Sequence, residues 1–188
     1  MNTVPVSTLL PARRTSGERV AQALIQTPLG PLTALADDAG LMGLWFDHQQ
    51  HGPGALAAPL DPGQPWLAQT REELDDYFAG RLRRFTVRLA PRGTPFQEAV
   101  WRELCTIAFG ATATYGRIAR AVGRPTAARA VGAAVGRNPI SILVPCHRVI
   151  GEDGSLTGYA GGLPRKIALL RLEGAAWRDE QPAQERLL

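Results

Sequence analysis

The spacing of apolar residues changes halfway along the chain, and this change constrains the fold more than any other feature. Residues 20–46 contain short apolar runs separated by turn residues at 28–30 and 38–40, which is typical of a small antiparallel sheet. From residue 94 onward, apolar residues recur at helical spacing, with glycines at the expected helix ends. We therefore expect an α/β (α+β) fold, with a small N-terminal antiparallel-sheet domain and a mainly helical C-terminal domain.

These patterns divide the chain into four parts. The expected division is a flexible arm over 1–17, an N-terminal α/β scaffold domain over 18–90, a C-terminal domain over 91–176 and a tail over 177–188. Within the N-terminal domain, residues 66–78 have helical spacing that ends at Gly80, and residues 85–90 (FTVRLA) predict a further strand.

The C-terminal domain opens with a helix-start signal and continues with a helix pair. Thr94 and Gln97 form a capping box, Pro95 occupies the first helical position, and the helix is expected to run to about Phe109. Two short helices follow, over 117–122 and 127–135, and Thr126 is expected to cap the second. The pair resembles a helix-turn-helix, although many such hairpins bind nothing.

The positive charge is concentrated in this second half. The formal net charge is +4, and no acidic residue lies between Glu103 and Glu152. This acid-free stretch contains six arginines: Arg117, Arg120, Arg124, Arg129, Arg137 and Arg148. A solvated basic face and a polyanion-binding surface, most often for nucleic acid, are both compatible with this pattern.

The second helix of the pair is composed almost entirely of small residues. Gly132 and Gly136 each cost about 1 kcal/mol of helix stability relative to alanine, so something should require them. Close packing against another helix is one reason, and entry into a narrow groove is the other. Arg129 is the one long side chain in the middle of this helix, either as an ordinary surface residue or as a group that enters a DNA stack.

The segment ISILVPCHRVIG carries the most chemistry. The apolar run 140–144 predicts a buried strand that delivers Cys146 beside His147 and Arg148. Such neighbours are expected to lower the pKa of the thiol, and the thiolate is the nucleophile that alkyl or acyl transfer to sulfur requires. An inert buried cysteine beside a structural histidine is the alternative.

A carboxylate could complete this site. Glu173 falls on the last turn of a helix that begins near Pro164, where its charge opposes the helix dipole. Rules broken locally often mark functional sites, and a glutamate that orients His147 would explain the position. A surface pair with Arg171 is the alternative.

The two cysteines also limit the class of protein. Cys105 and Cys146 are too few for a disulfide framework or a cysteine-based zinc site, and Cys105 is expected to be a small core residue. No apolar run reaches the roughly 18 residues of a membrane span, and residues 1–20 lack a secretory pattern. We expect a cytoplasmic protein without membrane association.

The segment VPCHRVIG, with RAVGAAVGRNP before it and GYAGG after it, resembles the O6-alkylguanine-DNA alkyltransferase family over residues 94–174. The N-terminal TPLGPLTALADDAG and LDDYFAG resemble bacterial members. The resemblance implies that Cys146 accepts the alkyl group, that His147 acts through a water as the base, and that Glu173 holds His147. It further implies that Asn138 is a hinge residue and that Tyr115 assists base rotation and protonates the departing guanine.

The resemblance also implies how DNA is bound. The partner is double-stranded DNA containing O6-alkylguanine, approached from the minor groove, with Arg129 filling the gap left by a flipped nucleotide. The remaining DNA-binding candidates are Thr126, Ala127, Ala128, Gly132, Ala133 and Arg137. The substrate pocket would include the Val149 carbonyl, the Tyr159 ring and the Ala160 N–H, with Ala160 standing where some relatives carry serine.

The implied reaction is irreversible and occurs once per molecule, since a thioether has no hydrolysable bond. No cofactor is expected, and no zinc, because residues 1–90 contain no cysteine. We expect a monomer in solution; activity on O4-alkylthymine stays open. Two alternatives are an alkyltransferase-like protein that binds damage without transfer, although such proteins lack the cysteine of PCHR, and a Cys–His–Glu hydrolase. A transcriptional regulator would carry an additional Cys-rich zinc domain.

Overall fold

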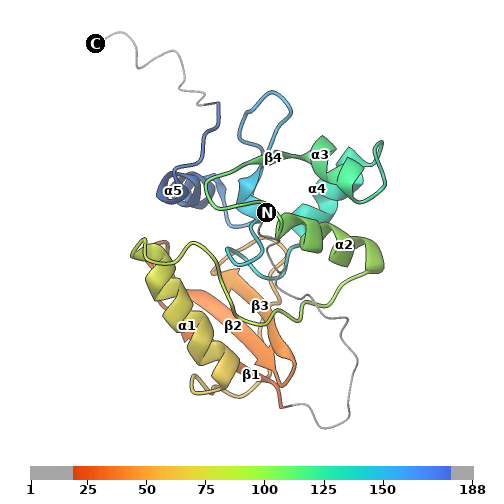
Figure 1. Ribbon diagram of the computed structural model, residues 1–188. Coiled ribbons are helices and arrows are strands. Elements are labelled where there is room, and N and C mark those ends of the chain that lie inside the picture. Colours follow the sequence, from red (N-terminus) through yellow and green to blue (C-terminus); the bar gives the residue numbers. More distant parts are fainter. Residues whose placement is uncertain (1–18, 179–188) are drawn as a thin grey trace, which may run out of the picture.

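The structure is a computed structural model that describes residues 19–178. The expected arm over 1–17 lies outside the described residues, as does the expected tail beyond residue 178. Two layers of structure are visible, with the sheet below and most of the helices above (Figure 1). The predicted α/β (α+β) class, with an antiparallel N-terminal sheet and a mainly helical C-terminal part, is confirmed.

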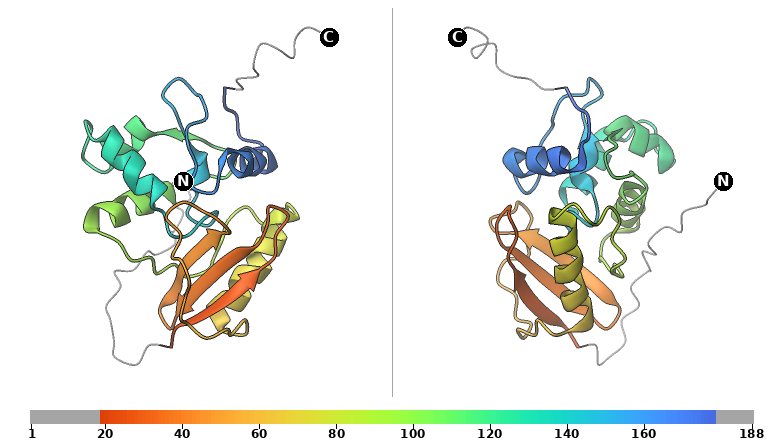
Figure 2. Two further views of the ribbon diagram at one scale, coloured as in Figure 1. Left: turned by 180° about the vertical axis from the view of Figure 1, so that it is seen from behind. Right: turned by 60° about the vertical axis from the view of Figure 1, so that its left-hand side comes forward.

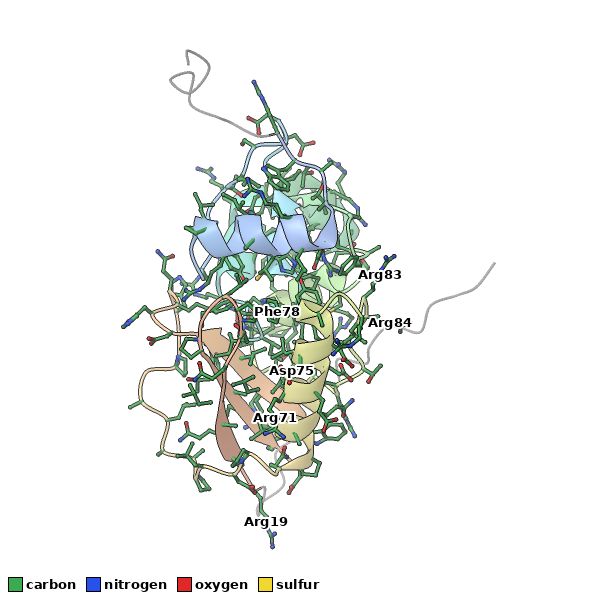
Figure 3. All side chains as sticks on the ribbon, turned by 90° about the vertical axis from the view of Figure 1, so that its left-hand side faces the viewer. Arg19, Arg71, Asp75, Phe78, Arg83 and Arg84 are labelled. Atoms are coloured by element: carbon green, nitrogen blue, oxygen red, sulfur yellow. The ribbon has the colours of Figure 1, made fainter. Side chains whose placement is uncertain are left out.

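The N-terminal region is a three-stranded antiparallel sheet with one helix on its face. The strands are β1 (Ala21–Ile25), β2 (Leu32–Asp37) and β3 (Gly40–Phe46), in the order β1-β2-β3. Helix α1 (Pro65–Phe78) covers one face of the sheet in both views of Figure 2. Its inward side chains are buried, whereas Arg71 and Asp75 lie on its outer face (Figure 3).

The predicted strand over 85–90 is wrong. Leu89 forms only an isolated bridge with Leu41, whose N–H and carbonyl bond to the neighbouring Arg88 and Ala90. The backbone N–H groups that a longer strand would use are taken by a side chain instead, because the Glu73 carboxylate accepts from the N–H groups of residues 86 and 87. This segment therefore runs beside the sheet without joining it.

The C-terminal region contains four helices and a two-stranded parallel pair among the described residues. Helix α2 spans Pro95–Leu104, and its capping box between Thr94 and Gln97 is present as predicted. The helix ends five residues before the expected Phe109, because the chain turns after Leu104: the Thr106 hydroxyl donates to the Glu103 carbonyl at 2.8 Å. Strands β4 (Ala113–Thr114) and β5 (Val149–Ile150) pair in parallel.

The helix pair is formed by α3 (Tyr115–Ala121) and α4 (Ala128–Gly136), which pack against each other and against α2. Helix α3 begins two residues earlier than predicted because the Thr114 side chain caps it by accepting from the Arg117 N–H. The predicted Thr126 cap of α4 is wrong. The N-cap is Ala127, which follows a turn closed by its N–H on the Arg124 carbonyl, so Thr126 lies one residue too early.

The predicted strand over 140–144 is also wrong, although the segment is buried. It is a tight turn in which Ile142 adopts a φ of 70°, and Ile140 makes only a single bridge with Leu44 of β3. The Asn138 amide donates to the carbonyls of Ile140 and Val144, and these side-chain bonds replace a strand ladder. The turn is followed by a 3₁₀ turn, η1 (Cys146–Arg148), and later by α5 (Leu163–Glu173).

Within residues 19–178, no helix has the length and apolar character needed to cross a membrane.

Candidate active site and nucleic-acid interface

A cavity of about 210 Å³ opens beside α4. It brings together five predicted site residues from four separate segments: Tyr115, Gly132, Cys146, Tyr159 and Ala160. Sequence reasoning missed the other lining residues, which are Gln50, Val135, Gly136 and Gly158. The Gln50 N–H donates to the Ala160 carbonyl at 3.0 Å, so the N-terminal domain forms part of the wall.

Asn138 holds the turn that presents Cys146. Its Nδ2 lies 3.0 Å from the Cys146 Sγ, 2.8 Å from the Val144 carbonyl and 3.2 Å from the Ile140 carbonyl. Its Oδ1 accepts from the Ile140 N–H at 3.0 Å. One buried amide thus connects the Cys146 sulfur to the backbone on both sides of the turn.

The sequence predicts a lowered pKa for the Cys146 thiol, whereas burial in this structure raises it. The donor from Asn138 and the charge of Lys166 act in the opposite direction. Lys166 is fully buried on α5, and its Nζ donates to the Val149 carbonyl at 2.6 Å and to the Thr157 carbonyl at 3.1 Å. Burial lowers the pKa of Lys166 to about 8. The thiol is therefore predominantly protonated at rest, with a cation near it.

His147 and Glu173 form a buried pair behind the cysteine. The His147 Nε2 lies 2.9 Å from the Glu173 Oε1. Burial lowers the pKa of His147, so the imidazole is neutral and its Nε2–H donates to the carboxylate. Its Nδ1 is buried and has no hydrogen-bond partner among residues 19–178, which leaves an acceptor available for a proton. The predicted contact between these two side chains is present.

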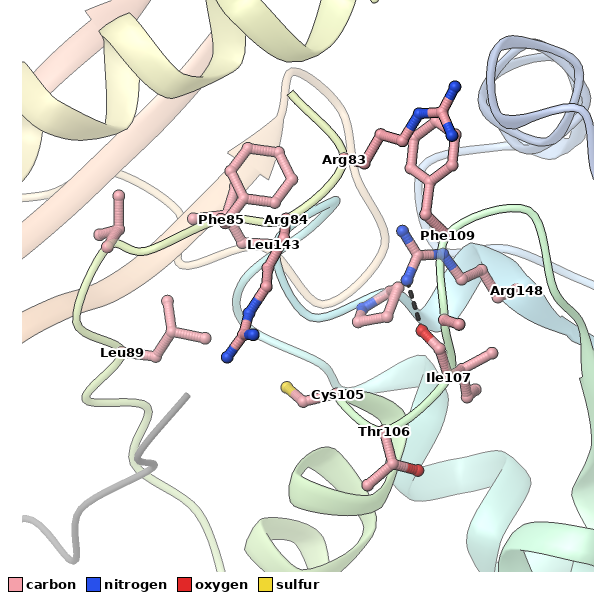
Figure 4. A pocket seen from close by; sticks show the side chains of 13 residues that line it. Arg83, Arg84, Phe85, Leu89, Cys105, Thr106, Ile107, Phe109, Leu143 and Arg148 are labelled. Atoms are coloured by element: carbon pink, nitrogen blue, oxygen red, sulfur yellow. Dashed lines mark hydrogen bonds between the residues drawn. The ribbon is translucent and has the colours of Figure 1, made fainter. Parts of the chain in front are cut away.

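Arg148 belongs in sequence to the acid-free arginine stretch, but its side chain is buried and pairs with Glu173. Its Nε and Nη2 donate to the carboxylate at 2.7 and 2.9 Å, and its Nη1 donates to the Ile107 carbonyl at 2.6 Å (Figure 4). Although burial opposes ionisation, the hydrogen bonds from His147 and Arg148 lower the pKa of Glu173 to about 2. Arg148, not Arg171, is thus the partner of this carboxylate.

Tyr77 is a further site residue that the sequence did not indicate. It lies on α1, and its hydroxyl donates to the Glu173 Oε1 at 2.8 Å. The helical spacing of residues 66–78 predicts only that Tyr77 is a core residue. Lys166 had a visible signal, since it is the single lysine in a chain that otherwise uses arginine.

The exposed surface of α4 lies next to the cavity. Arg129, Ala133 and Arg137 are exposed at intervals of four residues and share one face, with Thr126 exposed before the helix. Ala127, Ala128 and Gly132 are half-buried. The other arginines of the acid-free stretch, apart from Arg148, are exposed as well.

The two glycines of α4 are not explained by helix packing. A Cβ on Gly132 would meet the Tyr115 ring at an ordinary 3.7 Å, and a Cβ on Gly136 would meet nothing within 4 Å. Both glycines line the cavity. This geometry does not support close packing as the reason for the two glycines, and it shows that both leave room in the cavity.

A second cavity, of about 450 Å³, lies between the two domains, and Arg148 is one of its lining residues. It contains the half-buried Cys105, together with apolar side chains and the Phe109 ring, which lies between Arg83 and Arg148 (Figure 4). Burial raises the pKa of Cys105 to about 12. Cys105 packs against the core as expected, but its side chain is partly exposed.

The site thus combines a buried thiol, a His–Glu pair and a neighbouring helix pair with exposed arginines. Residues 95–175 match the DNA binding domain of the 6-O-methylguanine DNA methyltransferase family, and residues 20–91 match the ribonuclease-like domain of that family. The chain belongs to this family.

Relatives and solved structures agree with this assignment. The methylated-DNA–protein-cysteine methyltransferase of Mycobacterium tuberculosis is 50% identical over 149 residues, which cover 79% of this chain and 89% of that protein. The enzyme of the same name from Methanosarcina acetivorans is 46% identical over 155 residues, covering 81% and 97%. The crystal structure of M. tuberculosis OGT in complex with DNA matches with a TM-score of 0.76 at 47% identity, covering 82% of this chain and 92% of that one.

Proposed function

We propose that this protein is a methylated-DNA–protein-cysteine methyltransferase that repairs DNA by moving the alkyl group of O6-alkylguanine to Cys146. The observation that carries the proposal is the position of the Cys146 thiol, in a cavity beside α4 and backed by the His147–Glu173 pair. The family assignment and the DNA complex of the M. tuberculosis relative support DNA as the partner.

The transfer is a displacement at the alkyl carbon. The Cys146 proton passes through a water to the Nδ1 of His147, and Glu173 stabilises the resulting imidazolium. The sulfur forms a bond to the alkyl carbon while the bond from that carbon to O6 breaks, and its electron pair stays on guanine. Because the resting thiol is protonated, this base is needed at the moment of attack.

The departing guanine needs a proton, and Tyr115 is the proposed donor. Its ring lines the cavity, and its hydroxyl lies 2.8 Å from the Thr157 hydroxyl. Tyr159 walls the pocket, and the Ala160 N–H faces O6. The Cys146 and Val149 carbonyls are proposed to read the guanine amino group, although the Val149 carbonyl also accepts from Lys166.

Access to a base inside a duplex requires that the nucleotide leave the stack. We propose that α4 enters the minor groove, that Arg129 fills the resulting gap, and that the small residues of α4 allow the close approach. The exposed Arg137 and Thr126, with Ala127, Ala128 and Ala133, would contact the strand backbones. Asn138 would act as a hinge, because it contacts both the sulfur and the turn.

Each molecule acts once in this proposal, since the product is a thioether that water does not hydrolyse. The test is intact and peptide mass spectrometry after mixing the protein with a duplex that contains one O6-methylguanine. We expect one added CH₂ on the peptide that contains Cys146, saturating at one per protein. A parallel duplex with O4-methylthymine defines the range of substrates.

Two other outcomes would point to different functions. Tight binding without an adduct would indicate a protein that binds damage without transfer. Neither binding nor an adduct would favour a hydrolase, and turnover of activated esters would then be the measurement to make.

A further inference from the structure

Helix α1 of the N-terminal domain reaches the proton network of the C-terminal domain. In Figure 3 the end of α1 marked by Phe78 lies directly below α5, the helix that ends in Glu173. Tyr77, one residue earlier, is 1% exposed, and its hydroxyl donates to the Glu173 Oε1 at 2.8 Å. This bond joins residues 96 positions apart in the chain.

The same carboxylate oxygen serves three donors. The Glu173 Oε1 accepts from Tyr77 Oη, from His147 Nε2 at 2.9 Å and from Arg148 Nη2 at 2.9 Å, whereas Oε2 accepts from Arg148 Nε at 2.7 Å. Tyr77 is the neutral phenol in this set. It competes with His147 for the electron density of one oxygen, so its presence weakens the carboxylate as a base toward the imidazole.

The ring of Tyr77 is fixed by aromatic neighbours on several sides. Its centroid lies 5.3 Å from that of Phe78, 5.2 Å from that of Phe85 and 6.3 Å from that of Phe109. Burial and the nearby carboxylate raise the pKa of Tyr77, so the phenol stays protonated and remains a donor. The packed ring therefore holds the hydroxyl in one position, where it donates to Glu173.

We propose that Tyr77 is a positioning residue for the alkyl transfer, which sets the basicity of Glu173 and through it the pKa of His147. The N-terminal domain is then part of the reacting centre and not only a support for it. This inference rests on the proposed function, in which His147 takes the thiol proton.

The sign of the effect follows from the network. Tyr77→Phe removes one donor from Glu173 and keeps the ring packing, so the carboxylate becomes a stronger base and the pKa of His147 rises. A protonated His147 cannot accept the thiol proton. A lost hydrogen bond to a charged group is worth about one to two pKa units at Glu173 itself, and only part of that change reaches His147. The acidic limb of the pH–rate profile should then move to higher pH by about half a unit.

The experiment measures the single-turnover rate constant with free O6-benzylguanine between pH 5 and pH 9, for the wild type, Tyr77→Phe and Thr70→Val. Thr70 is the matched control, since it is fully buried on the same helix and its hydroxyl bonds to the Trp66 carbonyl at 2.6 Å, away from Glu173. We expect a shifted acidic limb for Tyr77→Phe only, with a fall of about threefold at the acid end of the profile and a much smaller change at pH 7. An unshifted limb, or an equal shift in Thr70→Val, overturns the role.

A second measurement separates this inference from the proposed function. The pKa of His147 is read by NMR from the imidazole nitrogen shifts of the unreacted protein, which needs no substrate. Tyr77→Phe should raise this pKa, and 3,5-difluorotyrosine at position 77, a stronger donor, should lower it. An unchanged value in both proteins overturns the role of Tyr77, whereas a wild type that takes up no alkyl group overturns only the proposed function.

Discussion

The two cysteines lie in two cavities, and the comparison between them shows what makes one thiol a candidate nucleophile. Burial raises the pKa of both Cys105 and Cys146, so a lowered resting pKa does not distinguish them. The difference lies in their partners. Cys146 has Asn138 at 3.0 Å and Lys166 nearby, whereas the charge acting on Cys105 comes from Arg148, which is already paired with Glu173.

The position of each cavity matters as much. The cavity of Cys146 is bounded by α4, whose exposed face carries arginines, whereas the cavity of Cys105 lies between the domains. Of the two thiols, only Cys146 therefore has both a nearby proton acceptor and a cavity beside α4 for a nucleobase. We infer that reactivity is created here by the surroundings during the reaction rather than by a thiolate at rest.

The largest effect separates the two thiols directly. Cys146→Ser should abolish the transfer of a methyl group from O6-methylguanine duplex, whereas Cys105→Ala should retain a rate within about twofold, since it removes only a partly buried small side chain. Peptide mass spectrometry after one hour of reaction checks both variants. An adduct on Cys105 in the first variant would break the comparison.

A smaller effect tests the carboxylate behind Cys146. Glu173→Gln removes the negative charge that stabilises an imidazolium on His147, and we expect the single-turnover rate to fall on the order of 10²-fold. Quenched-flow kinetics with the methylated duplex provide the rate. Glu98→Gln, a change on α2 in the same domain, serves as the control and should leave it unchanged.

The next effect tests access to the cavity. Arg129→Ala should slow the repair of duplex DNA by about tenfold, because filling the gap offsets only a part of the few kcal/mol that unstacking a base costs. The reaction with free O6-benzylguanine should be unchanged, since no base has to leave a duplex. Arg171→Ala, an exposed arginine on α5, is the matched control. Equal losses on both substrates would remove the proposed role of Arg129.

The last test concerns stability at low pH rather than rate. The pKa of Glu173 is lowered to about 2, so its contribution is complete above the ordinary value near 4.5 and is lost as the pH falls toward 2. Between pH 4.5 and pH 2, the free energy of unfolding of the wild type should fall by about 3 kcal/mol relative to that of Glu173→Gln. Urea unfolding at pH 5, 4 and 3 measures the difference, and a constant difference would show that folding does not change the pKa of Glu173.

The fold was predictable where local signals decide it. Turn residues at 28–30 and 38–40 place the antiparallel strands, and Thr94 with Gln97 starts α2 as expected. The errors occur where a side chain from elsewhere takes the backbone bonds. Glu73 does so at residues 86 and 87, and Asn138 does so around the turn before Cys146.

The candidate site divides in the same way. The motif PCHR and the glutamate before Gly174 indicated Cys146, His147 and Glu173 as site residues. The structure contains the predicted contact between His147 and Glu173. The sequence places Arg148 both beside Cys146 and among the arginines of the acid-free stretch, but it does not indicate what its side chain contacts. Its burial depends on Glu173 and Ile107, which lie 25 and 41 positions away.

The sequence by itself determined the antiparallel N-terminal sheet, the five α-helices of residues 19–178, the family and the identity of the nucleophile candidate, because these depend on spacing and on residue type within short segments. The tertiary structure alone decided that Tyr77 reaches Glu173, that Lys166 is buried near Cys146, and that the thiol is protonated at rest. A pKa depends on desolvation and on charges within a few ångströms, and those distances exist only after distant segments have packed together.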